Sequence, residues 1–319
     1  MNVGLFALCG LLAAVVLLPV WASPYMVSFL LSVFMYVALA GSWNLFSGTT
    51  GYLSLGHGLF FGIGAYAFAI AMAILHLDPF TSFLFSAIMS GLSAVLLGLV
   101  LLTTRIRIAY FAMVMLGLNE ISKTVVANIK AIGSSYGLTI PPLNNSLVAY
   151  YFLFGLAVCV TLFAFALQKS HWGYGLKAIV ADEVAAEVTG VGTVGHKMTM
   201  FVVSACFAGL TGGMIGWHWS YIDPYMAFDL VVSFNMVVMA VFGGMGTVFG
   251  PVIGAVLMSG LKEALSTSIP NFHTIIFGVL LVLLMIWQPG GMIEVVRAVD
   301  RRLRSKHKSG EPTFRRAAE

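Results

Sequence analysis

The 319-residue chain contains very few charged side chains. Asp, Glu, Lys and Arg make up only 9% of it and hydrophobic residues make up 60%, with a mean hydropathy of +0.99. An average soluble domain carries about 25% charged residues, which cover its surface. This composition therefore excludes a soluble globule of this size and indicates a protein whose solvent is lipid.

Cysteine is scarce, and its placement excludes two further classes of protein. Cys9, Cys159 and Cys206 each lie inside an apolar run. This spacing matches neither a disulfide framework nor a thiolate metal site. Because buried free cysteines behave as small hydrophobic residues, we expect no metal and no cofactor here.

Motifs for nucleotide binding and hydrolysis are also missing. The sequence contains no Gly-x-x-x-x-Gly-Lys-Ser/Thr loop and no His-Glu-x-x-His. These patterns would cradle phosphates or bind catalytic zinc. We therefore expect that the chain is not an enzyme. The net charge of +4 comes from loops and the C-terminal tail, so it does not predict a nucleic-acid partner.

Long apolar runs dominate what is present. A helix needs about 20 apolar residues to cross a bilayer, and only helices or closed barrels satisfy their backbone in lipid. Barrel strands would alternate in polarity, and these runs do not. The prediction is an all-α bundle of about 8–10 transmembrane helices. The expected spans lie near 3–21, 26–46, 55–76, 80–103, 108–128, 148–167, 198–219, 230–265 and 273–288.

Basic side chains indicate the orientation of the chain, since loops rich in Lys and Arg stay in the cytoplasm. Two loops and the tail carry them, which places both termini in the cytoplasm. We expect a transmembrane domain over 1–290 and a basic cytoplasmic tail over 291–319. The basic residues of the two loops are Arg105, Arg107, Lys169, Lys177 and Lys197.

The apolar stretch 230–265 is interrupted by glycine. Between the second basic loop and the tail the chain must cross an even number of times, but a simple count gives three spans. At 1.5 Å per residue, this stretch is too long for one untilted crossing. A broken or re-entrant helix pair corrects the count, and such a break requires surrounding protein or a water-filled cavity. The expected break contains Gly243, Gly244, Gly246, Thr247, Gly250 and Pro251.

Glycine also recurs at four-residue spacing within the expected helices. This spacing allows the backbones of membrane helices to approach closely. The pairs are Gly58/Gly62, Gly209/Gly213, Gly212/Gly216 and Gly250/Gly254.

The longest polar insert between spans is the loop 168–197. Asp182 is suited to cap a short helix, Glu183 to Val188 favour helix, and Gly190 is suited to end it. An exposed helix with an alanine-rich face could dock into a groove on another protein. The alternative is an ordinary solvated connector.

Two charges lie inside an expected span. Glu120 and Lys123 are three residues apart, so they can neutralise each other on one helix. A lone charge at the bilayer centre would cost about 2.5–3.5 kcal/mol on insertion scales. The pair is either part of a polar seam near a pathway or subunit interface, or a self-satisfied pair near the end of the span.

Several segments together resemble a known family. Glu183 to Gly190 is similar to the coupling loop of ABC importer permeases, in the LivM-like form of branched-chain amino-acid systems. The match also includes a Ser-Leu-Gly-His segment with Ser54 and His57, and covers about residues 40 to 290. The other matching segments are Phe201 to Gly213, Tyr221 to Pro224 and Gly243 to Gly254.

The resemblance implies a function and a set of partners. The chain would be the permease subunit of an importer in a bacterial-type inner membrane. It would translocate branched-chain amino acids, or small solutes such as urea and short amides, by alternating access. The implied partners are a second permease, two cytoplasmic ATPases and an extracytoplasmic solute-binding protein. The loop 131–142 lacks the family's usual Thr-Gly-Gly run, so the transport class is better defined than the solute.

The same resemblance implies roles for individual residues. The translocation path or helix break would include Ser54, His57 and the glycines near 243–250; His57 would either contact solute or bond to a backbone carbonyl. The ATPase-coupling loop would include Asp182, Glu183, Ala185, Ala186, Glu187 and Gly190.

A competing interpretation is an ion-coupled secondary transporter of small hydrophobic solutes, which would work without partners. Such a transporter usually relies on ionisable groups facing a cavity. Glu120 is the sole plausible intramembrane carboxylate in the sequence.

Overall fold

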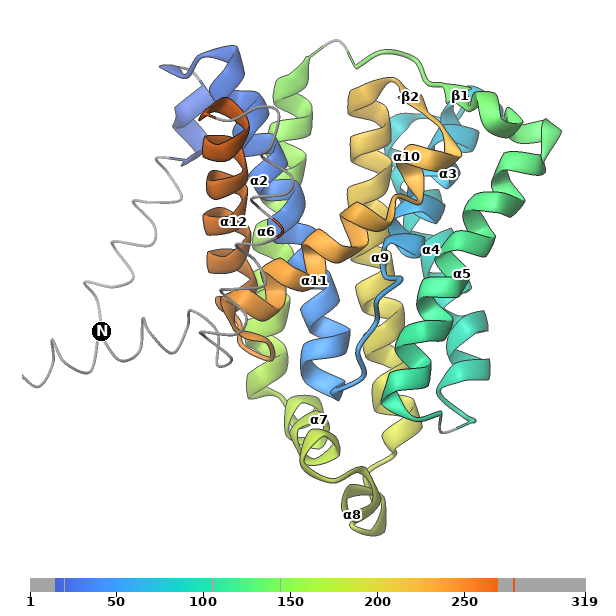
Figure 1. Cartoon of the computed structure of the whole chain (residues 1–319), viewed down its shortest axis with the longest axis vertical. Coiled ribbons are helices and arrows are strands. Elements are labelled where there is room, and N and C mark those ends of the chain that lie inside the picture. The colour runs from blue at the N-terminus through green and yellow to red at the C-terminus, as the bar shows by residue number, and fades with distance from the viewer. Residues whose placement is uncertain (1–14, 20, 105, 144, 269–277, 279–319) are drawn as a thin grey trace, which may run out of the picture.

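The computed structural model describes residues 15–19, 21–104, 106–143, 145–268 and 278. Most of the expected span 3–21, nearly all of the expected span 273–288 and the tail 291–319 lie outside the described residues. The described part is a bundle of helices with one short antiparallel strand pair (Figure 1). The expected all-α polytopic fold is confirmed.

Five of the described helical segments are long and apolar enough to cross a membrane. They contain α2 (Pro24–Trp43) with the π-helical turn η1 (Asn44–Gly48), α4 (Pro79–Leu101), α6 (Ser146–Lys169), α9 (Thr193–Trp219), and α10 (Pro224–Ala227) with α11 (Leu230–Gly244). The remaining helices are α3 (Gly58–Ala73), α5 (Ile108–Asn128), α7 (His171–Ala181), α8 (Glu183–Val188) and α12 (Gly250–Ser268). Short turns η2 (Lys130–Ile132) and η3 (Ser134–Tyr136) precede β1 (Leu138–Thr139), which pairs with β2 (Tyr221–Ile222).

The helix starts follow local chemistry. Ser23 caps α2 by accepting a bond from the Met26 amide, and Pro24 begins that helix. Asn145 caps α6 in the same way, through a 2.9 Å bond from the Leu147 amide. These residue types satisfy amides that have no partner inside the helix, and proline lacks the amide that would be unpaired there.

α3 is shorter than the expected span 55–76, because the chain from Gly51 to His57 is not helical. This segment runs through the protein interior. Its backbone is bonded to side chains: Ser54 accepts from Trp43 Nε1 at 2.7 Å, and the Ser54 amide donates to Ser47 Oγ at 3.2 Å. Non-helical backbone is tolerated at membrane depth where protein surrounds it.

Glycine lets α3, α4 and α9 pack with their backbones in contact. A β-carbon on Gly64 would collide with the backbone of Gly209, and one on Gly212 would collide with the Phe61 carbonyl. Ser86 of α4 binds two of the carbonyls exposed by this approach, those of Gly64 and Gly209, at 2.9 Å each. Close packing through the predicted glycines is confirmed here, whereas at Gly216 an added β-carbon would make only ordinary contacts.

The two ends of the bundle differ. The β1–β2 pair and α10 lie at one end, and α7 and α8 project from the other (Figure 1). Register places Leu138 opposite Ile222, and Ile222 is fully buried. The strand pair therefore ties the loop after α5 to the loop after α9.

Candidate functional site

The projecting unit consists of two helices where the sequence predicted one. Ser170 caps α7 through a 3.2 Å bond from the Gly173 amide. Asp182 Oδ1 caps α8, accepting from Val184 and Ala185 at 2.9 and 3.0 Å. Gly190 ends this turn with a φ of +91°, which favours glycine. The predicted cap and stop of α8 are thus confirmed, whereas α7 was not predicted.

α8 presents an apolar face to its surroundings. Val184 is 68% exposed and Val188 is 84% exposed. Side chains four residues apart share one face of a helix, so these two form a single patch. Ala185 and Glu187 are also exposed, whereas Ala186 is buried. Exposed apolar patches with polar neighbours mark protein interaction sites.

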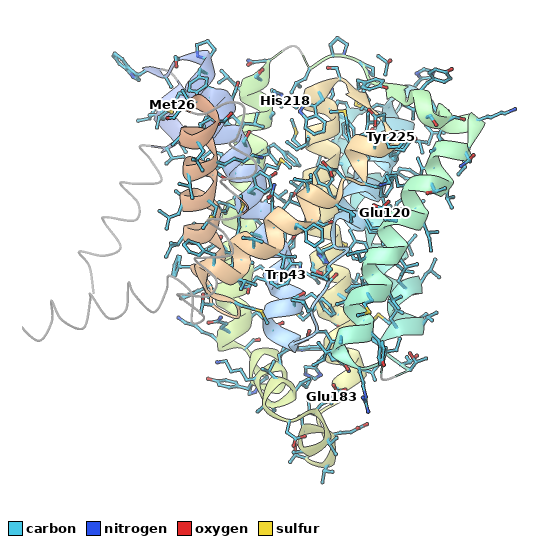
Figure 2. The ribbon with its side chains drawn as sticks, in the orientation of Figure 1. Met26, Trp43, Glu120, Glu183, His218 and Tyr225 are labelled. Atoms are coloured by element: carbon cyan, nitrogen blue, oxygen red, sulfur yellow. The ribbon has the colours of Figure 1, made fainter. Side chains whose placement is uncertain are left out.

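Glu183 faces the bundle. Figure 2 shows it where α8 meets the rest of the molecule. Its Oε1 lies 2.5 Å from Nζ of Lys197, whose side chain is completely buried. Its Oε2 accepts a 3.2 Å bond from the hydroxyl of Tyr52. Lys197 and Tyr52 were not predicted as site residues. Tyr52 is 131 positions from Glu183, and Lys197 was assigned only to the basic residues that orient the chain.

The predicted break between 243 and 251 is present. α11 ends at Gly244, α12 begins at Gly250, and a β-carbon on Gly243 would collide with the Gly250 carbonyl. Thr247 Oγ1 closes the turn by donating to the Gly244 carbonyl at 2.7 Å and accepting from the Gly250 amide at 3.0 Å. α12 returns toward the end of the bundle from which α11 comes (Figure 1). The interrupted stretch is therefore a helix pair.

Two side chains from other helices hold this break. Asn44, the first residue of η1, donates to the Thr247 carbonyl at 2.9 Å and accepts from the Gly246 amide at 2.7 Å. Gln168 donates to the Gly246 carbonyl at 3.0 Å. π-Helical turns are frequent at functional sites. Asn44 and Gln168 were not predicted, since isolated polar residues at helix ends give no sequence signal.

A cavity of about 370 Å³ joins the break to the projecting unit. It lies between η1, the end of α6, α7 and the turn after α11. Its lining residues are Gly48, Thr49, Leu167, Gln168, Gly173, Leu176, Lys177, Val180, Met245 and Gly246. The glycine break therefore lies near the end of the bundle that carries α7 and α8.

Ser54 and His57 lie inside the protein and line no cavity named above. Both side chains are fully buried. The His57 ring packs edge-on against Phe60 with 5.1 Å between ring centres. Within the described residues, Ser54 Oγ makes no hydrogen bond. Their roles in transport stay predictions.

Glu120 and Lys123 form an ion pair on α5 with 2.5 Å between Oε2 and Nζ. Their side chains are 37% and 24% exposed, respectively. The neighbouring Asn119 points inward and donates to the Phe228 carbonyl at 2.9 Å. The pair is therefore partly buried, and within the described residues Glu120 Oε1 has no hydrogen-bond partner. Whether the pair belongs to a polar seam stays a prediction.

Long apolar helices, a broken helix pair and a projecting helical unit define a multi-pass membrane permease. The family model described as "Branched-chain amino acid transport system / permease component" matches residues 25–286. The chain belongs to this family, and it is a transport subunit and not an enzyme. The ion-coupled interpretation gains no support.

Named relatives cover most of the chain. It is 27% identical to the high-affinity branched-chain amino acid transport system permease protein LivM of Salmonella typhimurium, over 94% of this chain and 78% of that one. It is 28% identical to LivM of Escherichia coli, over 90% of this chain and 75% of that protein. LivH of Salmonella typhimurium is 24% identical over 81% of this chain and 91% of its own length. No solved structure matches.

Proposed function

We propose that this chain carries branched-chain amino acids or close analogues across a bacterial inner membrane as one of two permeases in an ABC importer. The relatives' names support this class of solute. The partners are a second permease, two cytoplasmic ATPases and an extracytoplasmic solute-binding protein. Because the family is a permease component, ATP hydrolysis belongs to the separate ATPase subunits.

The projecting unit α7–α8 is the docking element for an ATPase. The observation that carries this proposal is the exposed pair Val184 and Val188 on a helix that projects from the bundle. Asp182 and Gly190 fix the two ends of α8, and the contact with the ATPase involves Ala185 and Glu187 beside the two valines. An amphipathic helix lying in a groove of a partner is a common mode of recognition.

The glycine break and the segment Gly51–His57 form part of the solute path. Both interrupt helices of the bundle, and broken helices are a feature of transporter sites. The break adjoins a cavity that also touches α7, so a displacement of α7 and α8 can reach it directly. In this scheme the paired ATPases close on ATP, move α8 and switch the path between the two sides of the membrane.

The α7–α8 end lies in the cytoplasm, as the basic loops predict. The β1–β2 end then faces the solute-binding protein, and both termini are cytoplasmic. Residues 1–290 form the membrane domain in this proposal, and 291–319 form a solvated basic tail.

The docking role of α8 is tested by changing Val188. Val188→Asp puts a charge into the apolar patch, so we expect loss of the ATPases from the purified complex and loss of uptake. Val188→Thr keeps the shape and should retain both. The measurement is the amount of ATPase that co-purifies with the tagged chain from equal amounts of membrane-inserted protein.

A matched control comes from the other end of the molecule. Tyr136 is 89% exposed in η3, and Tyr136→Asp makes a similar change in charge there. It should leave the ATPases bound. Normal ATPase recovery with Val188→Asp would exclude α8 as the docking element.

A further inference from the structure

We propose that Lys197, Glu183 and Tyr52 form a coupling bridge through which α8 moves the segment Gly51–His57 inside the membrane domain. This inference rests on the proposed function, since it assumes that an ATPase moves α8. It assigns to Glu183 a role inside the permease and adds Lys197 and Tyr52 as positioning residues.

The three side chains are in mutual contact. Lys197 Nζ lies 2.5 Å from Glu183 Oε1 and 3.3 Å from the Tyr52 hydroxyl. The same hydroxyl donates to Glu183 Oε2 at 3.2 Å. The ammonium group also lies 4.5 Å from the centre of the Tyr52 ring, within the range of a cation–π contact. Each member of the bridge therefore contacts both others.

Burial makes this cluster act as a unit. The Lys197 side chain has no exposed surface, whereas that of Glu183 is 29% exposed. A buried ammonium group that loses its carboxylate is left unpaired in a medium of low dielectric, which is strongly unfavourable. When α8 shifts, Lys197 and Tyr52 therefore either follow Glu183 or leave a charge unpaired. A cluster on the surface would exchange its partner for water without this penalty.

The bridge is connected to the interior on its far side. Tyr52 is the second residue of the non-helical segment Gly51–His57, and its ring packs edge-on against Phe111 of α5 with 5.5 Å between ring centres. At the end of that segment the Gly58 amide donates to Ser233 Oγ on α11 at 3.0 Å. α11 is the helix that ends at the glycine break. A continuous set of contacts thus runs from α8 to the helix pair of the proposed path.

A passive anchor for α8 would use the same contacts, so the test must separate anchoring from coupling. An anchor that fails would release the ATPases or destabilise the complex. A coupling bridge that fails would leave the complex assembled and hydrolysing ATP, but would transfer less solute for each ATP. The number of ATP molecules hydrolysed per solute imported therefore distinguishes the two roles.

The experiment uses the complete complex, purified with its partners and reconstituted in liposomes with the binding protein and radiolabelled leucine. ATP hydrolysis and leucine uptake are measured in the same vesicles. For Lys197→Met we expect normal assembly and a rise of about tenfold or more in ATP consumed per leucine, since the broken pair leaves Glu183 without its cation. Lys197→Arg keeps the charge and should stay near the wild-type ratio. Lys169→Met removes an exposed lysine at the end of the bundle that carries α7 and α8. This variant should also keep the wild-type ratio of ATP to leucine.

Two further variants keep the test decisive if Lys197→Met does not fold. Tyr52→Phe retains the ring and removes both hydroxyl bonds, so we expect an assembled complex with a raised ratio. The exchange Glu183→Lys with Lys197→Glu restores an ion pair and should restore part of the coupling. A wild-type ratio in Tyr52→Phe, or in an assembled Lys197→Met complex, overturns the bridge. A wild-type preparation that contains no ATPase overturns the proposed function and the bridge together.

Discussion

At the scale of single residues, the missing β-carbons of glycine set the distances between helices. α3 and α9 meet at Gly64 and Gly209, where the two backbones leave no space for a side chain. Association of helices in lipid depends on such packing, because the hydrophobic effect gives no preference for protein over lipid. Gly209 and Gly212 could be predicted as packing positions, because each is followed four residues later by another glycine. Which helix each one packs against depends on the fold and could not be predicted.

We predict that Gly64→Ala destabilises the protein. The added methyl group must displace the α9 backbone, and overpacking of this kind costs about 1–3 kcal/mol. Gly155→Ala is the matched control, because nothing lies within 4 Å of a β-carbon at that exposed position of α6. Alanine is about 1 kcal/mol better than glycine inside a helix, so this control should be neutral or stabilising. Thermal unfolding in detergent measures both, and equal midpoints would contradict the packing described here.

Among the helices, the sequence predicts the bounds of the long apolar helices well and predicts breaks and short helices less well. The expected spans agree with α2, α4, α6 and α9 to within a few residues, since apolar length decides them. The bounds of α5 agree as well, although α5 is not among the five segments apolar enough to cross a membrane. The glycine break was predictable because it disturbs the count of crossings. α7 was missed, because its buried Leu176 and Ile179 are two apolar positions in a segment that is otherwise mixed. The expected span 55–76 extends beyond α3 by three residues at each end.

The partners of the site residues could not be predicted for a different reason. Asp182 and Gly190 act on their own helix, so local sequence reveals them. Glu183 and Tyr52 are 131 positions apart, and Asn44 and Gly246 are 202 positions apart. Without a fold, nothing in the sequence indicates that either pair is in contact.

We predict that Asn44→Leu impairs transport by releasing the turn after α11. The variant keeps a similar volume but leaves the Gly246 amide and the Thr247 carbonyl without the bonds from Asn44. An unsatisfied buried polar group costs about 1–3 kcal/mol. Uptake should fall several-fold, and a cysteine placed at Thr247 should react faster with thiol reagents than in the wild-type background. Unchanged reactivity would show that Asn44 does not hold the break.

As a whole molecule, the protein has two unlike ends. One end carries the projecting unit α7–α8, the cavity of about 370 Å³ and the glycine break. The opposite end is closed by the β1–β2 pair and α10. This polarity suits a permease that receives solute at one end and a mechanical displacement at the other.

Labelling of single cysteines tests this orientation. Val188 and Tyr136 are 84% and 89% exposed at opposite ends, so cysteines placed there are accessible to reagents. In intact spheroplasts a membrane-impermeant maleimide should react with Tyr136→Cys, and with Val188→Cys only after permeabilisation. The native cysteines are replaced beforehand, so that only the introduced cysteine can react. Labelling of Val188→Cys from outside would reverse the proposed orientation.

The central claim is that this chain works as a permease within an ATP-driven importer. The most direct test is mass spectrometry of the proteins that co-purify with the tagged chain, extracted in mild detergent from its native membrane. We expect recovery of a second permease of the same family together with ATPase subunits. Recovery of this chain alone, in a form that still supports ion-driven uptake after reconstitution, would contradict it.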